Sequence, residues 1–238
     1  DRIQCFRIET ALFVATARIL LLLCLLLMSA RNGTDGGFLP VDLMGDRSFA
    51  LGTIGVAAMG FTVASMFIPL MYWLQTVAGA SPSASGLITA PMSVLALVLT
   101  PVAGYLTDRR DPGKLSAAGF AVSAAALVLA IVLIRADANL WWFTAVTALL
   151  GIGGAFVWAP NAAVTMRGID ERETGAASGL YNTARQVGSV LGVALVGVVL
   201  ASGDIDATAG KALALPVVAM VVGVVSSISI APRNRTAR

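Results

Sequence analysis

Arg185 is a charged residue deep inside an apolar stretch, roughly ten residues into residues 176–202, and Gln186 follows it. Removing an isolated guanidinium from water costs about 3 kcal/mol on membrane-insertion scales, so Arg185 should face a cavity or a partner group. We therefore predict that Arg185 lines a central pathway or tethers two helices. The alternative is a side chain that reaches back to the cytoplasmic interface along its aliphatic stem.

Uncharged polar side chains occur at similar depth in other apolar stretches. Tyr72 and Gln75 lie in one of them, and Asn161 lies in another. A few such groups, set among apolar side chains, orient a small molecule in a pocket. The predicted substrate-binding residues are Tyr72, Gln75, Asn161, Arg185 and Gln186.

Large apolar side chains near these groups are suited to line the same pocket, because they repack around molecules of varied shape. The candidates are Met66, Phe67, Met71, Tyr72, Phe156 and Trp158. The alternative is that they only pack helices together. Pro69 and Pro160 occupy matching places in two stretches, and we expect both helices to bend there.

Catalytic and metal chemistry have little support in this composition. The chain has no histidine, and Cys5 and Cys24 have no metal-ligand or redox spacing. All thirteen acidic residues lie at or outside the ends of the apolar stretches. We therefore expect no catalytic residue, no metal and no cofactor, and we predict that the protein is not an enzyme.

The elements that hold these residues are apolar runs long enough to cross a bilayer. Hydrophobic residues make up 58% of the 238 residues and charged residues 12%, which is unsuited to a soluble domain. Runs of about 17–25 residues or more predict an all-α polytopic membrane protein. The predicted spans are 11–30, 49–77, 86–107, 115–134, 139–165, 176–202 and 213–231. Residues 11–30 are interrupted by Arg18, and a signal peptide is the alternative there.

Basic residues set the expected orientation. Arg109, Arg110 and Lys114 lie in a short turn between two charge-free runs, so that turn is assigned to the cytoplasm. Alternation of the spans then leaves ten basic residues in inner segments and four in outer ones. This topology accounts for the sequence pI of about 9.2 without a nucleic-acid partner.

The chain also contains a faint internal repeat. Ser85-Gly86-Leu87 recurs 93 residues later at residues 178–180, and Pro69 recurs 91 residues later as Pro160. Three spans in 49–134 are thus followed by three spans of opposite starting orientation, a unit of several transporter folds. Small residues four apart also predict tight helix packing at two sites, Gly175 with Gly179 and Gly188 with Gly192.

Three segments resemble the major facilitator superfamily, in particular its fourteen-helix drug:proton antiporter branch. The segment from Gly104 to Lys114, with Asp108-Arg109-Arg110, resembles the family's loop signature, and residues 175–188 resemble its penultimate helix. Phe38-Leu39-Pro40-Val41-Asp42-Leu43 resembles the loop that enters the carboxyl-terminal half. The resemblance implies a gating role for Gly104, Asp108, Arg109 and Gly113, although Gly113 lies five residues after Asp108 where the pattern has three.

On this resemblance, residues 49–231 form a six-helix carboxyl-terminal bundle of two inverted three-helix repeats. Residues 1–48 are a preceding membrane helix with a cytoplasmic linker, and residues 232–238 are a cytoplasmic tail. The implied partners are the lipid bilayer, a small-molecule substrate with protons, and either an amino-terminal bundle or a second copy. The proton-carrying carboxylate is then expected in the other bundle.

The expected function is proton-coupled efflux of amphipathic drugs or small molecules by alternating access, in the cell membrane (the cytoplasmic membrane if the source is bacterial). Two alternatives remain open from the sequence. One is a truncated membrane protein that does not transport, and the other is a transporter of a different solute such as a metabolite or lipid.

Overall fold

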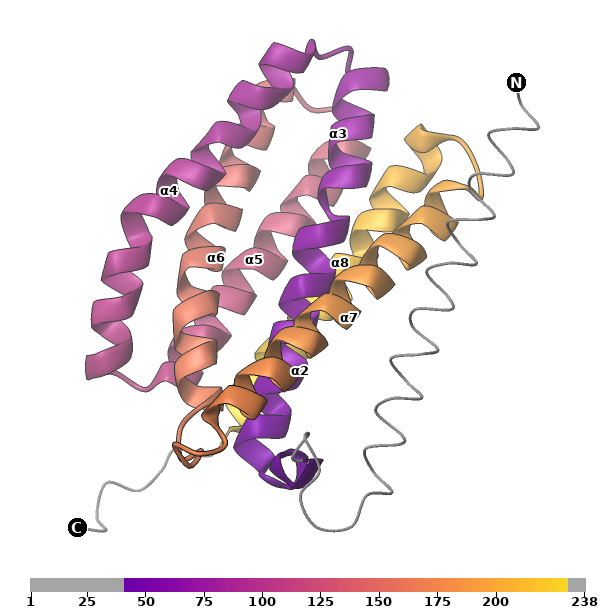
Figure 1. The fold of residues 1–238 in the computed structure, drawn as a ribbon. Helices are drawn as coiled ribbons and strands as arrows, with labels where there is room; N and C mark the ends of the chain where they lie inside the picture. Colours follow the sequence, from indigo (N-terminus) through magenta and orange to yellow (C-terminus); the bar gives the residue numbers. More distant parts are fainter. Residues whose placement is uncertain (1–40, 231–238) are drawn as a thin grey trace. The chain divides into compact units, whose positions relative to one another are not determined.

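The computed structural model describes residues 41–230, and all of its regular elements there are helices (Figure 1). The predicted first span (11–30) and the predicted tail (232–238) lie outside the described residues. The elements are η1 (Val41–Gly45), α2 (Arg47–Ser65), α3 (Phe67–Thr76), α4 (Pro82–Arg109), α5 (Pro112–Arg135), η2 (Leu140–Trp142), α6 (Phe143–Thr165), α7 (Thr174–Leu200) and α8 (Ile205–Ser229). Counting α2 with α3, six helical spans are long and apolar enough to cross a membrane, which confirms the predicted class.

Polar residues and prolines begin the helices where the apolar runs start. Asp46 caps α2 by accepting a hydrogen bond from the Phe49 backbone N–H at 2.8 Å. Ser81 and Asp111 cap α4 and α5, and each of these two helices then starts with proline, whose missing N–H is not needed there. The short polar turns therefore end one span and begin the next within a few residues.

Two spans differ from the sequence prediction. Residues 49–77 form two helices, because the helix is interrupted at Met66, three residues before Pro69. Pro160 occupies the matching place in α6, but α6 continues through it without a break. The two prolines therefore do not interrupt their helices in the same way. The last helix begins at Ile205, not at residue 213, and therefore includes Lys211. Asp206 in its first turn favours this early start, because a negative charge interacts well with a helix amino terminus.

The two repeats are interleaved, because each first helix packs on helices of the other repeat. The span α2 packs against α7 and α8, and the matching span α6 packs against α4 and α5. The third helices, α5 and α8, also lie against each other, and Ser116 and Ser227 hydrogen-bond across that contact at 3.2 Å. Because each repeat packs its first helix on the other repeat, the two repeats share one core.

Close backbone contacts reproduce the repeat residue by residue. The α2 glycine Gly60 lies against the Arg185 carbonyl of α7, so closely that a β-carbon would not fit. Gly151, which is 91 residues after Gly60, lies in the same way against the Met92 carbonyl of α4. Met92 is 93 residues before Arg185, so both offsets match those of the sequence repeat. The inverted repeat predicted from faint similarity is thus present in the packing.

The matching helices α4 and α7 are the least covered. Within the most apolar window of each span, 11% of α4 and 17% of α7 is buried, compared with 56% of the α2–α3 span. Many of their exposed side chains are large and apolar, among them Leu97 and Val198. These surfaces are suited to lipid or to a further helical partner.

Candidate functional site

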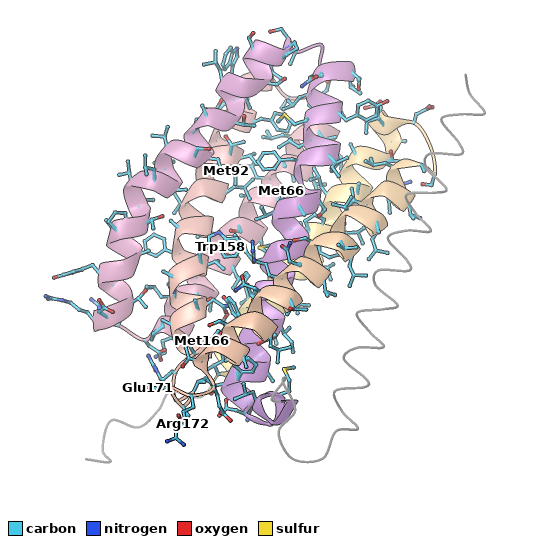
Figure 2. The ribbon with its side chains drawn as sticks, in the orientation of Figure 1. Met66, Met92, Trp158, Met166, Glu171 and Arg172 are labelled. Carbon is cyan, nitrogen blue, oxygen red and sulfur yellow. The ribbon has the colours of Figure 1, made fainter. Side chains whose placement is uncertain are left out.

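A pocket of about 320 Å³ opens between α6 and α7. We call it the α6–α7 pocket, and it is lined by Trp158, Ala162, Tyr181, Asn182 and Arg185. Figure 2 shows Trp158 at mid-height of the bundle. The pocket therefore combines an indole, a phenol, an amide and a guanidinium at membrane depth, a mixture of apolar wall and few polar groups that suits an organic molecule.

Arg185 contributes the only charge of this pocket. It lies in α7, and its side chain is partly exposed. The acidic residues of the described chain all lie in turns or in the terminal turns of helices, and none lies at the middle of a span. Within residues 41–230, the counter-charge for Arg185 is therefore not supplied by a neighbouring helix.

Asn161, a predicted substrate-binding residue, is buried and does not line the pocket. Its side chain is 1% exposed, and its Nδ2 donates to the Gly52 carbonyl at 3.0 Å and to the Tyr181 hydroxyl at 2.9 Å. The amide thus links α6 to α2 and α7. Its Oδ1 has no hydrogen-bond partner among the described residues. In this conformation Asn161 supports the pocket from behind by holding Tyr181.

The other predicted binding residues lie outside the α6–α7 pocket. Tyr72 and Gln75 are exposed on α3, and Gln186 is exposed on α7. Of the apolar candidates, Trp158 lines the pocket, whereas Met66 is buried in the core. Sequence reasoning missed Tyr181, and the available signal was its position four residues before Arg185, which puts both on one face of α7.

Of the predicted gating residues, Gly104, Asp108 and Arg109 lie in the last turns of α4, and Gly113 lies in the first turn of α5. The Arg109 guanidinium stands 4.3 Å above the centre of the Tyr105 ring, a cation–π contact that holds it at the helix end. The carboxylate that caps the next helix is Asp111, which accepts from the Gly113 N–H at 3.0 Å, while Asp108 is exposed. A β-carbon added at Gly104 would have no atom within 4 Å, so Gly104 makes no close contact with another helix within residues 41–230.

Comparison with known proteins agrees with this architecture. The family model of the Major Facilitator Superfamily matches residues 50–237. An uncharacterised transporter of this type from Mycobacterium tuberculosis, Rv1250, is 31% identical over 77% of the chain and 33% of its own length. The uncharacterised transporter YebQ of Escherichia coli is 32% identical over 83% of the chain and 43% of its length. The tetracenomycin C resistance and export protein of Streptomyces glaucescens is 31% identical over 70% of the chain and 31% of its length.

The chain thus spans about a third to two-fifths of the length of these relatives. The match covers all six described spans, and it falls on a helical membrane bundle whose internal repeat is visible in the packing. This chain belongs to the Major Facilitator Superfamily of membrane transporters.

Proposed function

We propose that this chain is the carboxyl-terminal bundle of a proton-coupled exporter of amphipathic small molecules in the cell membrane. In this proposal the α6–α7 pocket is one wall of the substrate path. The bundle rocks against a second bundle, so that the path opens alternately to each side of the membrane. The named activity of the Streptomyces glaucescens relative, resistance to and export of tetracenomycin C, supports an organic cargo.

The observation that carries the proposal is the partly exposed Arg185 in a pocket with aromatic walls. A charge at membrane depth is retained where it meets a cavity, a cargo or a partner group. Trp158 and Tyr181 offer flat apolar surface beside it, which suits an aromatic molecule with a polar group.

The proposed second bundle is supported by the exposed faces of α4 and α7. These two helices occupy equivalent places in the repeats and are the least buried. The relatives are two to three times longer than the matched part, which leaves length for another bundle. The described spans hold no carboxylate at their middle, so the proton carrier is proposed to lie in that bundle.

The test compares the chain alone with the chain encoded together with any membrane spans upstream of it. Both are produced in bacteria that lack their main efflux pumps, and ethidium efflux is followed by fluorescence. We expect efflux with the longer product, and its loss when an uncoupler dissipates the proton gradient. Full efflux by the chain alone would favour a homodimer, and no efflux by either would support a membrane protein that does not transport.

The role of Arg185 is tested in the active form. Arg185→Ala should reduce efflux by at least about tenfold without lowering the amount in the membrane, because it removes the pocket's charge. Met92→Ala is the matched control, since Met92 holds the equivalent place against α6 and lies outside the pocket. Unchanged efflux by Arg185→Ala would remove Arg185 from the substrate path.

A further inference from the structure

A second and larger pocket, of about 710 Å³, lies at one end of the bundle among α3, α5 and α8. We call it the end pocket. Its lining includes four charged residues, Arg135, Asp137, Asp206 and Lys211, together with the apolar Val77 and Ile134. None of these residues lines the α6–α7 pocket.

The end pocket is lined by charges of both signs, and these charges do not pair with one another in the described part of the chain. Within residues 41–230, none of the four forms an ion pair with another residue at 4 Å or less. Arg135 ends α5, and Asp137 follows it in a turn with a φ of 46°, which non-glycine residues rarely adopt. Asp206 and Lys211 come from the first two turns of α8. Two cations and two carboxylates therefore line one cavity, ready for a ligand that carries both charges.

The location of the pocket points to the membrane surface. Trp141 and Trp142 follow closely in η2 and are 57% and 63% exposed. Exposed tryptophans at the ends of membrane spans mark the level of the lipid headgroups. Arg135 and Lys211 are also the only basic residues at this end of the described bundle, so the positive-inside rule assigns the pocket to the outer leaflet.

We propose that the end pocket binds the phosphoethanolamine headgroup of an outer-leaflet phospholipid. Arg135 and Lys211 contact the phosphate, and Asp137 and Asp206 accept hydrogen bonds from the primary amine. Charge-assisted hydrogen bonds of this kind need N–H groups on the ligand, so a choline headgroup, which has none, binds more weakly. Val77 and Ile134 provide apolar contact for the start of the acyl chains.

The chain is tested by thermal stability in detergent with added lipid, a measurement that does not depend on transport. Phosphatidylethanolamine should raise the unfolding temperature more than phosphatidylcholine or phosphatidylglycerol of the same chain length. Soluble O-phosphoethanolamine at equal concentration should have little effect, because it lacks the acyl contacts. An equal effect of the soluble compound would overturn the lipid as the source, and equal effects of ethanolamine and choline lipids would overturn the proposed contacts.

Variants assign the effect to the pocket. Arg135→Gln with Lys211→Gln should weaken apparent affinity for phosphatidylethanolamine by about tenfold, the scale of one lost charged hydrogen bond. Arg167→Gln with Arg172→Gln removes the same charge at the opposite end and should leave the affinity unchanged. Asp206→Asn alone should reduce the preference for ethanolamine over glycerol headgroups, and this single change serves if the double variant does not fold. Retention of the full preference in both end-pocket variants would refute the proposal.

Discussion

Gly188 is the position where adding one methyl group should damage the bundle most directly. A β-carbon there would stand 2.8 Å from the carbonyl carbon of Ala57 and 3.0 Å from its Cα, with the carbonyl oxygen closer still. All three atoms belong to the backbone of α2, so no side-chain rotation relieves the overlap. Gly188→Ala therefore requires α2 and α7 to move apart.

The magnitude follows from the kind of clash. Overpacking of a tightly packed site costs about 1–3 kcal/mol. Each kcal/mol shifts the unfolding temperature of a domain of this size by about 2–4 °C. The clash alone should therefore lower the unfolding temperature by about 2–12 °C. Alanine is also the better helix former by up to about 1 kcal/mol, which offsets about 2–4 °C of this loss.

Gly179→Ala is the matched control because it makes the same change in the same helix. No atom lies within 4 Å of the position of a β-carbon at Gly179, so only the gain in helix propensity remains. Both proteins are purified in detergent and heated while the folded fraction is followed by size-exclusion chromatography with fluorescence detection. Equal unfolding temperatures for the two variants would refute the assignment of Gly188 to the α2–α7 contact.

Three further experiments test other parts of the structure. Asn161→Leu should lower the free energy of unfolding by about 1–3 kcal/mol, because it leaves buried polar groups unpaired, and Tyr181→Phe should lower it by about 1 kcal/mol. Thermal unfolding measures both losses. A larger loss with Tyr181→Phe than with Asn161→Leu would contradict the role of Asn161 in holding Tyr181. Asp111→Ala should cost about 1 kcal/mol by removing the cap of α5, and an unchanged unfolding temperature would show that the cap contributes nothing. Cysteines replacing Lys114 and Lys211 should react with an impermeant maleimide from opposite sides of the membrane, and labelling from one side would refute the topology.

The membrane spans were the part of the fold that the sequence predicted best. Apolar runs and the polar turns between them are local features that can be read from the sequence without knowing the fold. Five of the six described spans therefore lie within a few residues of their predicted bounds. The last helix was predicted to begin at residue 213, after Lys211, but it begins at Ile205. A long charged side chain can lie near the end of a membrane helix and reach the interface, so charge alone does not mark where a helix starts.

The candidate site was predicted less completely. Arg185 was identified because a charge in an apolar stretch is unusual whatever the fold. Tyr181 was missed, and Tyr72 was placed with Arg185 although the structure does not bring it to the α6–α7 pocket. Which side chains share a pocket depends on which helices are neighbours, and this chain pairs helices from different repeats.

The two glycine pairs of α7 separate what the sequence determined from what only the tertiary structure decided. The sequence by itself determined the membrane spans, the inverted repeat and two pairs of small residues four apart, since these depend on hydropathy and helical period. Only the tertiary structure decided that Gly188 and Gly192 lie against the α2 backbone, whereas a β-carbon at Gly175 or Gly179 would meet no atom of another helix within residues 41–230. Identical spacing defines the same kind of helix face, but a close contact forms only where the crossing of another helix brings its backbone near.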